Sequence, residues 1–211
     1  MNIPVPTFSS SSEVAKKLLE IEAIKFNFDE LFTWVSGIKS PIYCDNRKIG
    51  AFVNVRDTVV SAFTNLISSE FPETEVIAAV ATGGMTIGAI VADRLKLPFI
   101  YVRSEPKKYG LRKQIEGYYE PQQKVILIED HISTGKSSAN AIEALLNNDL
   151  QLLCLISIMT YGFKVAKDLY HSLNVKHKSI SDLDQIIQIA IETGRINQDQ
   201  KDILLTFRNS H

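Results

Sequence analysis

Apolar runs and amphipathic stretches alternate along the middle of this chain. The apolar runs, rich in β-branched residues, predict strands at Val76–Ala81, Phe99–Arg103, Lys124–Glu129 and Leu152–Met159. Helical spacing of apolar residues follows three of these runs and predicts helices over Met85–Leu95, Ser137–Asn147 and Phe163–Leu173. This alternation predicts an α/β fold with a central, mostly parallel sheet that is flanked by helices on both faces.

The segments before and after this core are patterned as well. Ser10 and Glu13 have the spacing of a capping box, which predicts a helix that ends near Ala23. A longer helix is predicted over Val55–Phe71, and Gly194 is expected to end the first of two helices in the tail. The remaining predicted elements are short strands at Lys25–Phe28, Leu31–Val35 and Pro41–Asp45, and the tail helices Asp182–Ile191 and Asn197–Phe207.

Composition narrows the class of protein. The chain has 211 residues, 45% of them hydrophobic, and a net charge of −1, which suits one domain and argues against nucleic acid as a partner. No apolar stretch is long enough to predict a membrane span. The start lacks the order of charged and apolar residues of a secretory signal. Cys44 and Cys154 lie far apart, so we expect a reduced, cytoplasmic protein.

The richest chemistry lies where the strand that ends at Glu129 turns into a helix. Glu129 and Asp130 stand at the tip of this strand, and Ser133, Thr134 and Gly135 form the loop before the helix. Backbone N–H groups and the helix N-terminus suit a phosphate. Two adjacent carboxylates cannot hold phosphate, but they can accept hydrogen bonds from a sugar diol. The segment therefore predicts a site for a sugar phosphate.

Two other interpretations of this segment are weaker. Gly135-Lys136-Ser137 looks like the end of a P-loop, but that motif needs a glycine at the position of Asp130, where an acid would repel a triphosphate. An ordinary strand-to-helix turn with solvated acids would need the strand, the acids and the loop to coincide by chance.

The whole segment from Val125 to Ser138 resembles the phosphoribosyl pyrophosphate (PRPP) motif of type I phosphoribosyltransferases. The resemblance implies that Glu129 and Asp130 orient the ribose. It also implies a set of PRPP-binding residues around the phosphate, which comprises His131, Ile132, Ser133, Thr134, Gly135, Lys136 and Ser137. Lys136 departs from the glycine that the family usually has there.

A second segment, from Phe32 to Arg47, resembles the N-terminal hood of orotate phosphoribosyltransferases. The resemblance implies that Lys39 and Arg47 bind the orotate carboxylate and that Ser133 also contacts orotate. Tyr43 is expected to stack on the pyrimidine ring, although a tyrosine that only packs in a sheet would have the same pattern.

A third segment, Arg103–Gly110 with Gln114–Gly117 after it, is similar to the family's mobile catalytic loop. Arg103, Lys107 and Tyr109 are then PRPP-binding residues, and Lys107 is the catalytic cation that meets the leaving group. Tyr109 replaces the usual histidine. The family's loop reaches into the partner subunit, which implies a homodimer with shared active sites.

The turn Ala81-Thr82-Gly83-Gly84 follows another strand. The resemblance places pyrophosphate against Thr82 and Gly83, in a position where related enzymes can carry lysine. A tight turn that only packs on the sheet is the competing interpretation, because glycines permit close backbone approach in either case.

The resemblance covers nearly the whole chain and implies the type I phosphoribosyltransferase fold as a single domain, 1–211. The hood spans roughly residues 1–50 plus the C-terminal helices, and the core spans roughly 51–175. The implied activity is transfer of phosphoribosyl from PRPP to orotate, with Lys107, Glu129 and Asp130 as catalytic residues. Mg²⁺ would be carried by PRPP without a direct protein ligand, and Asp130 would at most touch its waters. The alternatives are a purine or uracil salvage transferase and a non-catalytic regulator that senses PRPP.

Overall fold

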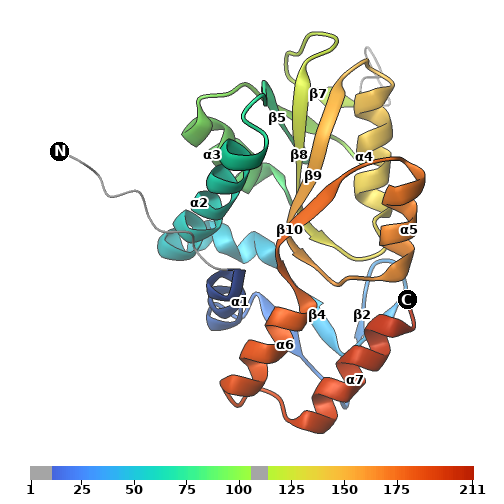
Figure 1. Ribbon diagram of the computed structural model, residues 1–211. Helices are drawn as coiled ribbons and strands as arrows, with labels where there is room; N and C mark the ends of the chain where they lie inside the picture. The colour runs from blue at the N-terminus through green and yellow to red at the C-terminus, as the bar shows by residue number, and fades with distance from the viewer. Residues whose placement is uncertain (1–10, 106–113) are drawn as a thin grey trace, which may run out of the picture.

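The computed structural model describes residues 11–105 and 114–211, and a six-stranded sheet runs through its centre (Figure 1). The strand order is β10-β9-β8-β5-β6-β7, and all neighbours are parallel except β6 and β7. The strands are β5 (Val76–Val80), β6 (Phe99–Val102), β7 (Ile115–Glu116), β8 (Lys124–Ile132), β9 (Gln151–Thr160) and β10 (His177–Asp182). The predicted α/β class with a mostly parallel sheet is confirmed.

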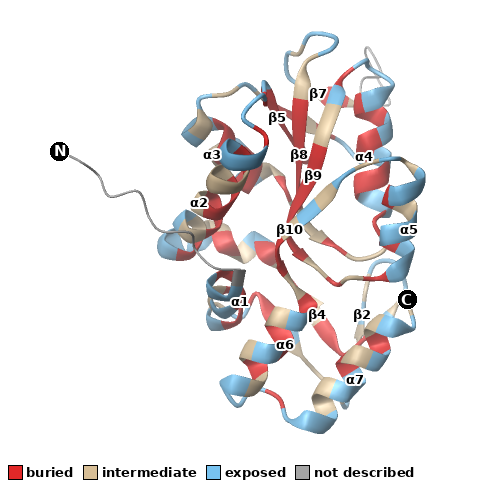
Figure 2. Ribbon diagram, in the orientation of Figure 1, coloured by how far each residue is buried: buried red, intermediate tan, exposed pale blue. Residues whose placement is uncertain are grey.

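Helices cover both faces of the sheet, as the sequence pattern predicts. Alternate residues of β8 show how: Ile126 and Ile128 pack toward one apolar cluster, whereas Val125 and Leu127 belong to the other. All four are fully buried, and Figure 2 shows the buried strands between the helical layers. The first cluster includes residues of α2 (Val53–Glu70) and α3 (Met85–Leu95), and the second includes residues of α4 (Lys136–Leu146) and α5 (Lys164–Ser172). Within the described ranges, the helices are too short or too polar to cross a membrane.

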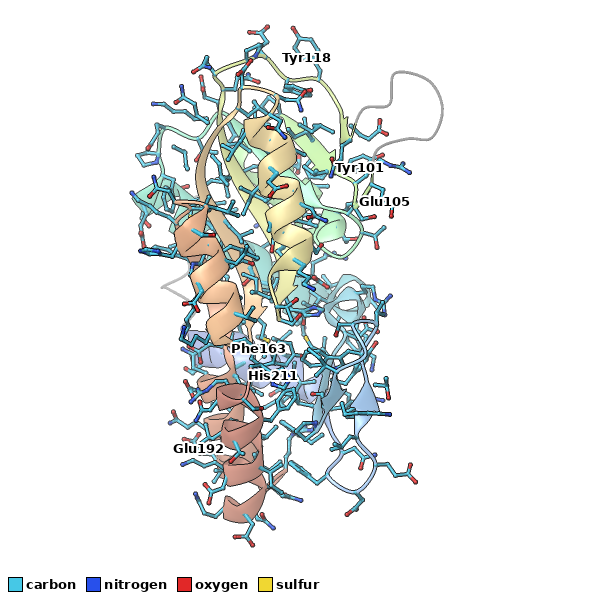
Figure 3. All side chains as sticks on the ribbon, turned by 90° about the vertical axis from the view of Figure 1, so that its right-hand side faces the viewer. Tyr101, Glu105, Tyr118, Phe163, Glu192 and His211 are labelled. Atoms are coloured by element: carbon cyan, nitrogen blue, oxygen red, sulfur yellow. The ribbon has the colours of Figure 1, made fainter. Side chains whose placement is uncertain are left out.

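The N-terminal segment and the C-terminal helices gather at one end of the sheet and form the hood (Figure 1). The ring of Trp34 packs edge-on against Phe207 at 5.8 Å, which joins the N-terminal segment to the last helix. The ring of His211 stacks on Phe163 at 4.9 Å (Figure 3), which ties the C-terminus to the segment that follows β9. The hood elements are α1 (Ser11–Glu20), β1 (Ile24–Phe26), β2 (Phe32–Thr33), β3 (Lys39–Ser40), β4 (Ile42–Cys44), the 3₁₀ helix η1 (Asn46–Ala51), α6 (Leu183–Glu192) and α7 (Gln198–Asn209).

The structure corrects several predicted element boundaries. The strand predicted over Leu31–Val35 is only β2, because the chain turns back after Trp34, whose N–H donates to Ile38 O across a turn with Gly37 at φ +86°. β10 was not predicted, since its sequence is polar and it lies at the edge of the sheet. The first tail helix begins one residue later than predicted, because the Asp182 side chain accepts from Gln185 N–H as its N-cap. The predicted cap Ser10 lies outside the described residues.

Candidate active site

A cavity of about 610 Å³ opens where β5 and β8 end, beneath the hood. This is the edge at which parallel α/β sheets bind ligands. Four regions line it: the hood, the turn after β5, the end of β8 with its loop and the start of α4, and Tyr161 directly after β9. The lining residues are Trp34, Val35, Ser36, Tyr43, Cys44, Asp45, Arg47, Ala81, Thr82, Gly83, Glu129, Asp130, His131, Ser133, Ser137 and Tyr161.

The two predicted acids lie in this wall, but their environments differ. Glu129 is buried, and its Oε2 has no hydrogen-bond partner among the described residues. Burial and the nearby charge of Asp130 raise the pKa of Glu129 well above its ordinary value. Burial acts in the same direction on Asp130, but hydrogen bonding and charge from His131 outweigh it and lower the Asp130 pKa. Asp130 is therefore the acid that stays ionised.

His131 stands beside Asp130 and forms an ion pair with it when the imidazole is protonated. Its Nδ1 lies 3.1 Å from Asp130 Oδ2, and its backbone N–H donates to Asp130 Oδ1 at 2.8 Å. Although burial opposes protonation, the hydrogen bond and charge of Asp130 raise the His131 pKa. The ring also meets Tyr161 edge-on at 6.0 Å between centroids. The cavity thus contains a histidine that is easier to protonate than a free one.

The loop after β8 forms a smaller cavity of about 110 Å³ at the start of α4. Gly135 has φ +78° and precedes the first residue of the helix, Lys136. Behind the loop, the Ser138 hydroxyl donates to Gly135 O at 3.2 Å and lies 2.7 Å from the Tyr170 hydroxyl of α5. Burial raises the Tyr170 pKa to about 12, so its hydroxyl stays protonated. The residues around this cavity run from the end of β8 into the first turn of α4 and include the set predicted for PRPP, namely His131, Ile132, Ser133, Thr134, Gly135, Lys136 and Ser137.

The turn after β5 packs against the same acid. A β-carbon added to Gly83 would lie 2.4 Å from Asp130 Oδ2, and one added to Gly84 would lie 2.6 Å from Ile128 O. Both positions therefore require glycine for close approach. Thr82 and Gly83 line the main cavity, as expected for residues that touch a ligand there.

The hood residues predicted for the base fall into two groups. Tyr43 lines the cavity and packs on Phe32 at 5.5 Å between ring centroids. Arg47 also lines it, and its Nε lies 2.6 Å from Asp45 Oδ1. Lys39 is different: its Nζ donates to Thr33 Oγ1 at 2.6 Å on the β2–β3 hairpin, away from the cavity wall.

The predicted catalytic loop is only partly described. Arg103 lies outside the cavity wall, with its Nη1 3.8 Å from Glu116 Oε1. Lys107 and Tyr109 lie outside the described residues.

Several lining residues have no assigned role in the sequence analysis. Trp34 packs on Tyr161 at 4.8 Å between centroids, and its Nε1 donates to Ile42 O at 3.2 Å. Tyr161 follows β9 directly, so the rule that ligands bind at the carboxyl ends of parallel strands would have flagged it. Asp45 lies within the hood motif, and no sequence signal marked it as a lining residue. In the structure it lines the cavity and pairs with Arg47.

Comparisons with known proteins agree on one family. Residues 54–193 match the family described as phosphoribosyl transferase domain. The orotate phosphoribosyltransferase of Porphyromonas gingivalis is 43% identical to this chain over 197 residues, which cover 93% of the chain and 94% of that protein. The Staphylococcus aureus enzyme of the same name is 42% identical over 200 residues, 95% of the chain and 98% of that protein.

Solved structures give the same picture. The orotate phosphoribosyltransferase of Aeropyrum pernix matches with a TM-score of 0.75 and 26% identity, over 87% of this chain and 99% of that one. Leishmania donovani UMP synthase matches with a TM-score of 0.81 over 95% of this chain and 42% of that one. At 23% identity, the second likeness concerns the fold alone.

Proposed function

This chain belongs to the phosphoribosyl transferase family, in its orotate phosphoribosyltransferase branch, and from that premise we propose that it makes orotidine 5′-monophosphate from PRPP and orotate in pyrimidine biosynthesis. One observation supports this most directly. The acid pair, the edge of the phosphate loop and the aromatic and cationic hood residues line a single cavity. That cavity can hold a sugar phosphate and a flat anionic base side by side.

In the proposed reaction, N1 of orotate attacks C1′ of PRPP. The new N–C bond forms as the C1′–O bond to pyrophosphate breaks, with inversion at C1′, and pyrophosphate leaves with the electron pair. The N1 proton of orotate is released to pyrophosphate or solvent. Positive charge develops on the ribose and negative charge on the leaving group. The task of the protein is therefore positioning and charge stabilisation.

We assign the ribose and its phosphate to the end of β8. The ionised Asp130 accepts hydrogen bonds from the ribose hydroxyls, and Glu129 supports it from a buried position. The 5′-phosphate sits at the N-terminus of α4, where backbone N–H groups and hydroxyls converge. Its ligands in this proposal are Ser133, Thr134, Gly135 and Ser137, with Lys136 as an added cation.

We assign pyrophosphate to the turn after β5 and to the loop. Thr82 and Gly83 offer backbone N–H groups from the cavity wall. Lys107 meets the leaving group, while Arg103 and Tyr109 accompany it. The role of this loop rests on the family resemblance, since its central residues are not among those described.

For orotate, Arg47 is the better placed of the two predicted cations. It lines the cavity, whereas Lys39 is engaged with Thr33 on the hairpin. Tyr43 offers a ring face to the pyrimidine, and Ser133 stands at the junction of base and sugar phosphate. Val35, fully exposed at the mouth of the cavity, supplies no charge.

Mg²⁺ is the cation that fits these residues. The ionised Asp130 provides hard carboxylate oxygen atoms, and the buried Glu129 Oε2, which has no hydrogen-bond partner in the described chain, is a further oxygen in the same wall. Within residues 11–105 and 114–211, however, no three acidic, histidine or cysteine side chains gather as a metal site. The PRPP diphosphate and hydroxyls would supply most ligands, with Asp130 near the bound waters. When bound, the cation offsets charge on the departing pyrophosphate.

We also propose a cytoplasmic homodimer that exchanges the loop between subunits. The cysteines Cys44 and Cys154 are both unpaired and buried, which suits a reducing compartment. Mixing an inactive Lys107→Ala subunit with an inactive Asp130→Asn subunit tests the exchange. If each site takes its loop from the partner subunit, one site of a hybrid dimer contains both substitutions and the other contains neither, so activity returns. If each loop serves its own subunit, every site keeps one substitution and the hybrid stays inactive.

A single-turnover comparison separates this activity from the alternatives. With Mg²⁺ and PRPP, the protein should consume orotate and leave uracil, adenine and hypoxanthine unchanged. Turnover of one of the other bases would favour a salvage transferase. PRPP binding without turnover of any base would favour a regulator.

A further inference from the structure

Asn46 links the hood to the acid pair by a direct hydrogen bond. It is the first residue of η1 and only 3% of it is exposed. Its Nδ2 donates to the main-chain oxygen of Asp130 at 2.8 Å, a contact between residues 84 positions apart. The main chain of Asp130 is thus held by a hood segment, and the residues on either side of Asn46 line the cavity.

The neighbours of Asn46 show what this contact joins. Asp45 and Arg47 line the cavity and pair with each other at 2.6 Å. Cys44 precedes Asp45 and is buried near Asp130. Burial is the main cause that raises the pKa of the Cys44 thiol, and the negative charge of Asp130 raises it further. The stretch 44–47 therefore packs on the acid strand, and its side-chain hydrogen bond to the Asp130 main chain comes from Asn46, whereas Arg47 bonds to Asp45.

Stability alone does not explain an asparagine here. Its Oδ1 is buried and has no hydrogen-bond partner in the described residues. Burying this atom without a partner carries a desolvation cost that offsets the stability gained from the hydrogen bond to Asp130 O. The amide cannot be turned to improve this, because Oδ1 would then face the Asp130 carbonyl oxygen. What the asparagine supplies is the donor to Asp130.

We propose that Asn46 is a positioning residue for the ribose subsite, which acts by fixing the main chain of Asp130. This rests on the proposed function, in which the Asp130 carboxylate accepts from the ribose diol. Without the amide, Asp130 can shift relative to Gly83 and His131, which border its carboxylate. The hood and the acid pair would then lose their fixed relation.

The test measures Mg²⁺-PRPP binding by calorimetry, together with melting temperature. Asn46→Ala should weaken PRPP binding about tenfold, the equivalent of one lost hydrogen bond. The matched control is Ser40→Ala, since Ser40 is another buried hood residue, whose hydroxyl donates to Ile42 O at 2.7 Å within the hood. It should lower the melting temperature and leave PRPP affinity unchanged. If Asn46→Ala folds poorly, Asn46→Ser replaces it, because serine is too short to span the same distance.

A double-mutant cycle with Asp130→Asn separates positioning from general destabilisation. If Asn46 acts through the Asp130 carboxylate, Asn46→Ala should change PRPP affinity by less than about twofold in the Asp130→Asn background. Equal losses in both backgrounds, or equal affinities of Asn46→Ala and Ser40→Ala, would overturn the proposal. Failure of the wild-type protein to bind Mg²⁺-PRPP would instead overturn the proposed function.

Discussion

A β-carbon on Gly83 would lie 2.4 Å from Oδ2 of Asp130, so the turn after β5 and the acid at the end of β8 pack without room for any side chain between them. Related enzymes can carry lysine at the position of Gly83. In this chain, such a side chain would displace the carboxylate that we assign to the ribose. Asp130 can therefore keep this position only because residue 83 has no side chain.

Gly83→Ala should weaken PRPP binding about tenfold or more, because the methyl group must push the Asp130 carboxylate out of place. Calorimetric titration with Mg²⁺-PRPP measures this. Gly50→Ala is the matched control, since a β-carbon there would meet Thr86 Cγ2 at an ordinary 3.7 Å. Equal PRPP affinities in the two variants would show that Asp130 can move without consequence.

Tyr170→Phe should raise the KM for PRPP several-fold and leave kcat nearly unchanged. The Tyr170 hydroxyl contacts Ser138, which in turn holds Gly135 of the phosphate loop. The 5′-phosphate does not react, so a looser loop weakens ground state and transition state alike. Tyr119→Phe, which loses a hydroxyl contact to Asn148 at 3.0 Å, is the control. A fall in kcat with unchanged KM would contradict this role of the loop.

His131 should make folding stability depend on pH in a defined direction. Its pKa in the folded protein lies above the ordinary 6.5, so its stabilising contribution is complete below that value and is lost as pH rises through the folded pKa. The melting temperature of the wild type should therefore exceed that of His131→Gln by more at about pH 5.5 than at about pH 8.5. About a third of the side chain is exposed, so the effect should be small. An opposite trend would show that burial, not Asp130, dominates.

Lys107→Ala should slow turnover about a hundredfold while leaving PRPP affinity largely intact, because one charge contact to the developing pyrophosphate is lost. Single-turnover rates and calorimetry measure the two effects separately. Lys108→Ala offers a neighbouring cation as the control and should change the rate much less. Equal rates for wild type and Lys107→Ala would remove Lys107 from the mechanism.

The sequence predicted the core of the fold because its parallel strands are buried on both faces and are continuously apolar. β8, with Val125 through Ile128 fully buried, is the clearest case. β10 has no such run, since only Ile180 and Ser181 among its six residues are buried. The hood strands are two or three residues long and carry too little pattern for their limits to be predicted.

The candidate site was predictable where chemistry is local in sequence. Glu129, Asp130 and Ser133 adjoin one strand end, and all three line the cavity. The contacts of Asn46 with Asp130 and of Tyr170 with Ser138 were not predictable, because each joins residues far apart along the chain. For Lys39 the resemblance supplied a residue type but not the contact of its Nζ with Thr33 Oγ1, and its role toward the base stays a prediction.

The loss of orotate absorbance on addition of PRPP tests the central claim most directly. With Mg²⁺ present, the absorbance should fall only when protein and PRPP are both added, and excess EDTA should abolish the change. Asp130→Asn should slow it strongly. An unchanged orotate spectrum with folded wild-type protein, PRPP and Mg²⁺ would contradict the assignment of this cavity to orotate phosphoribosyl transfer.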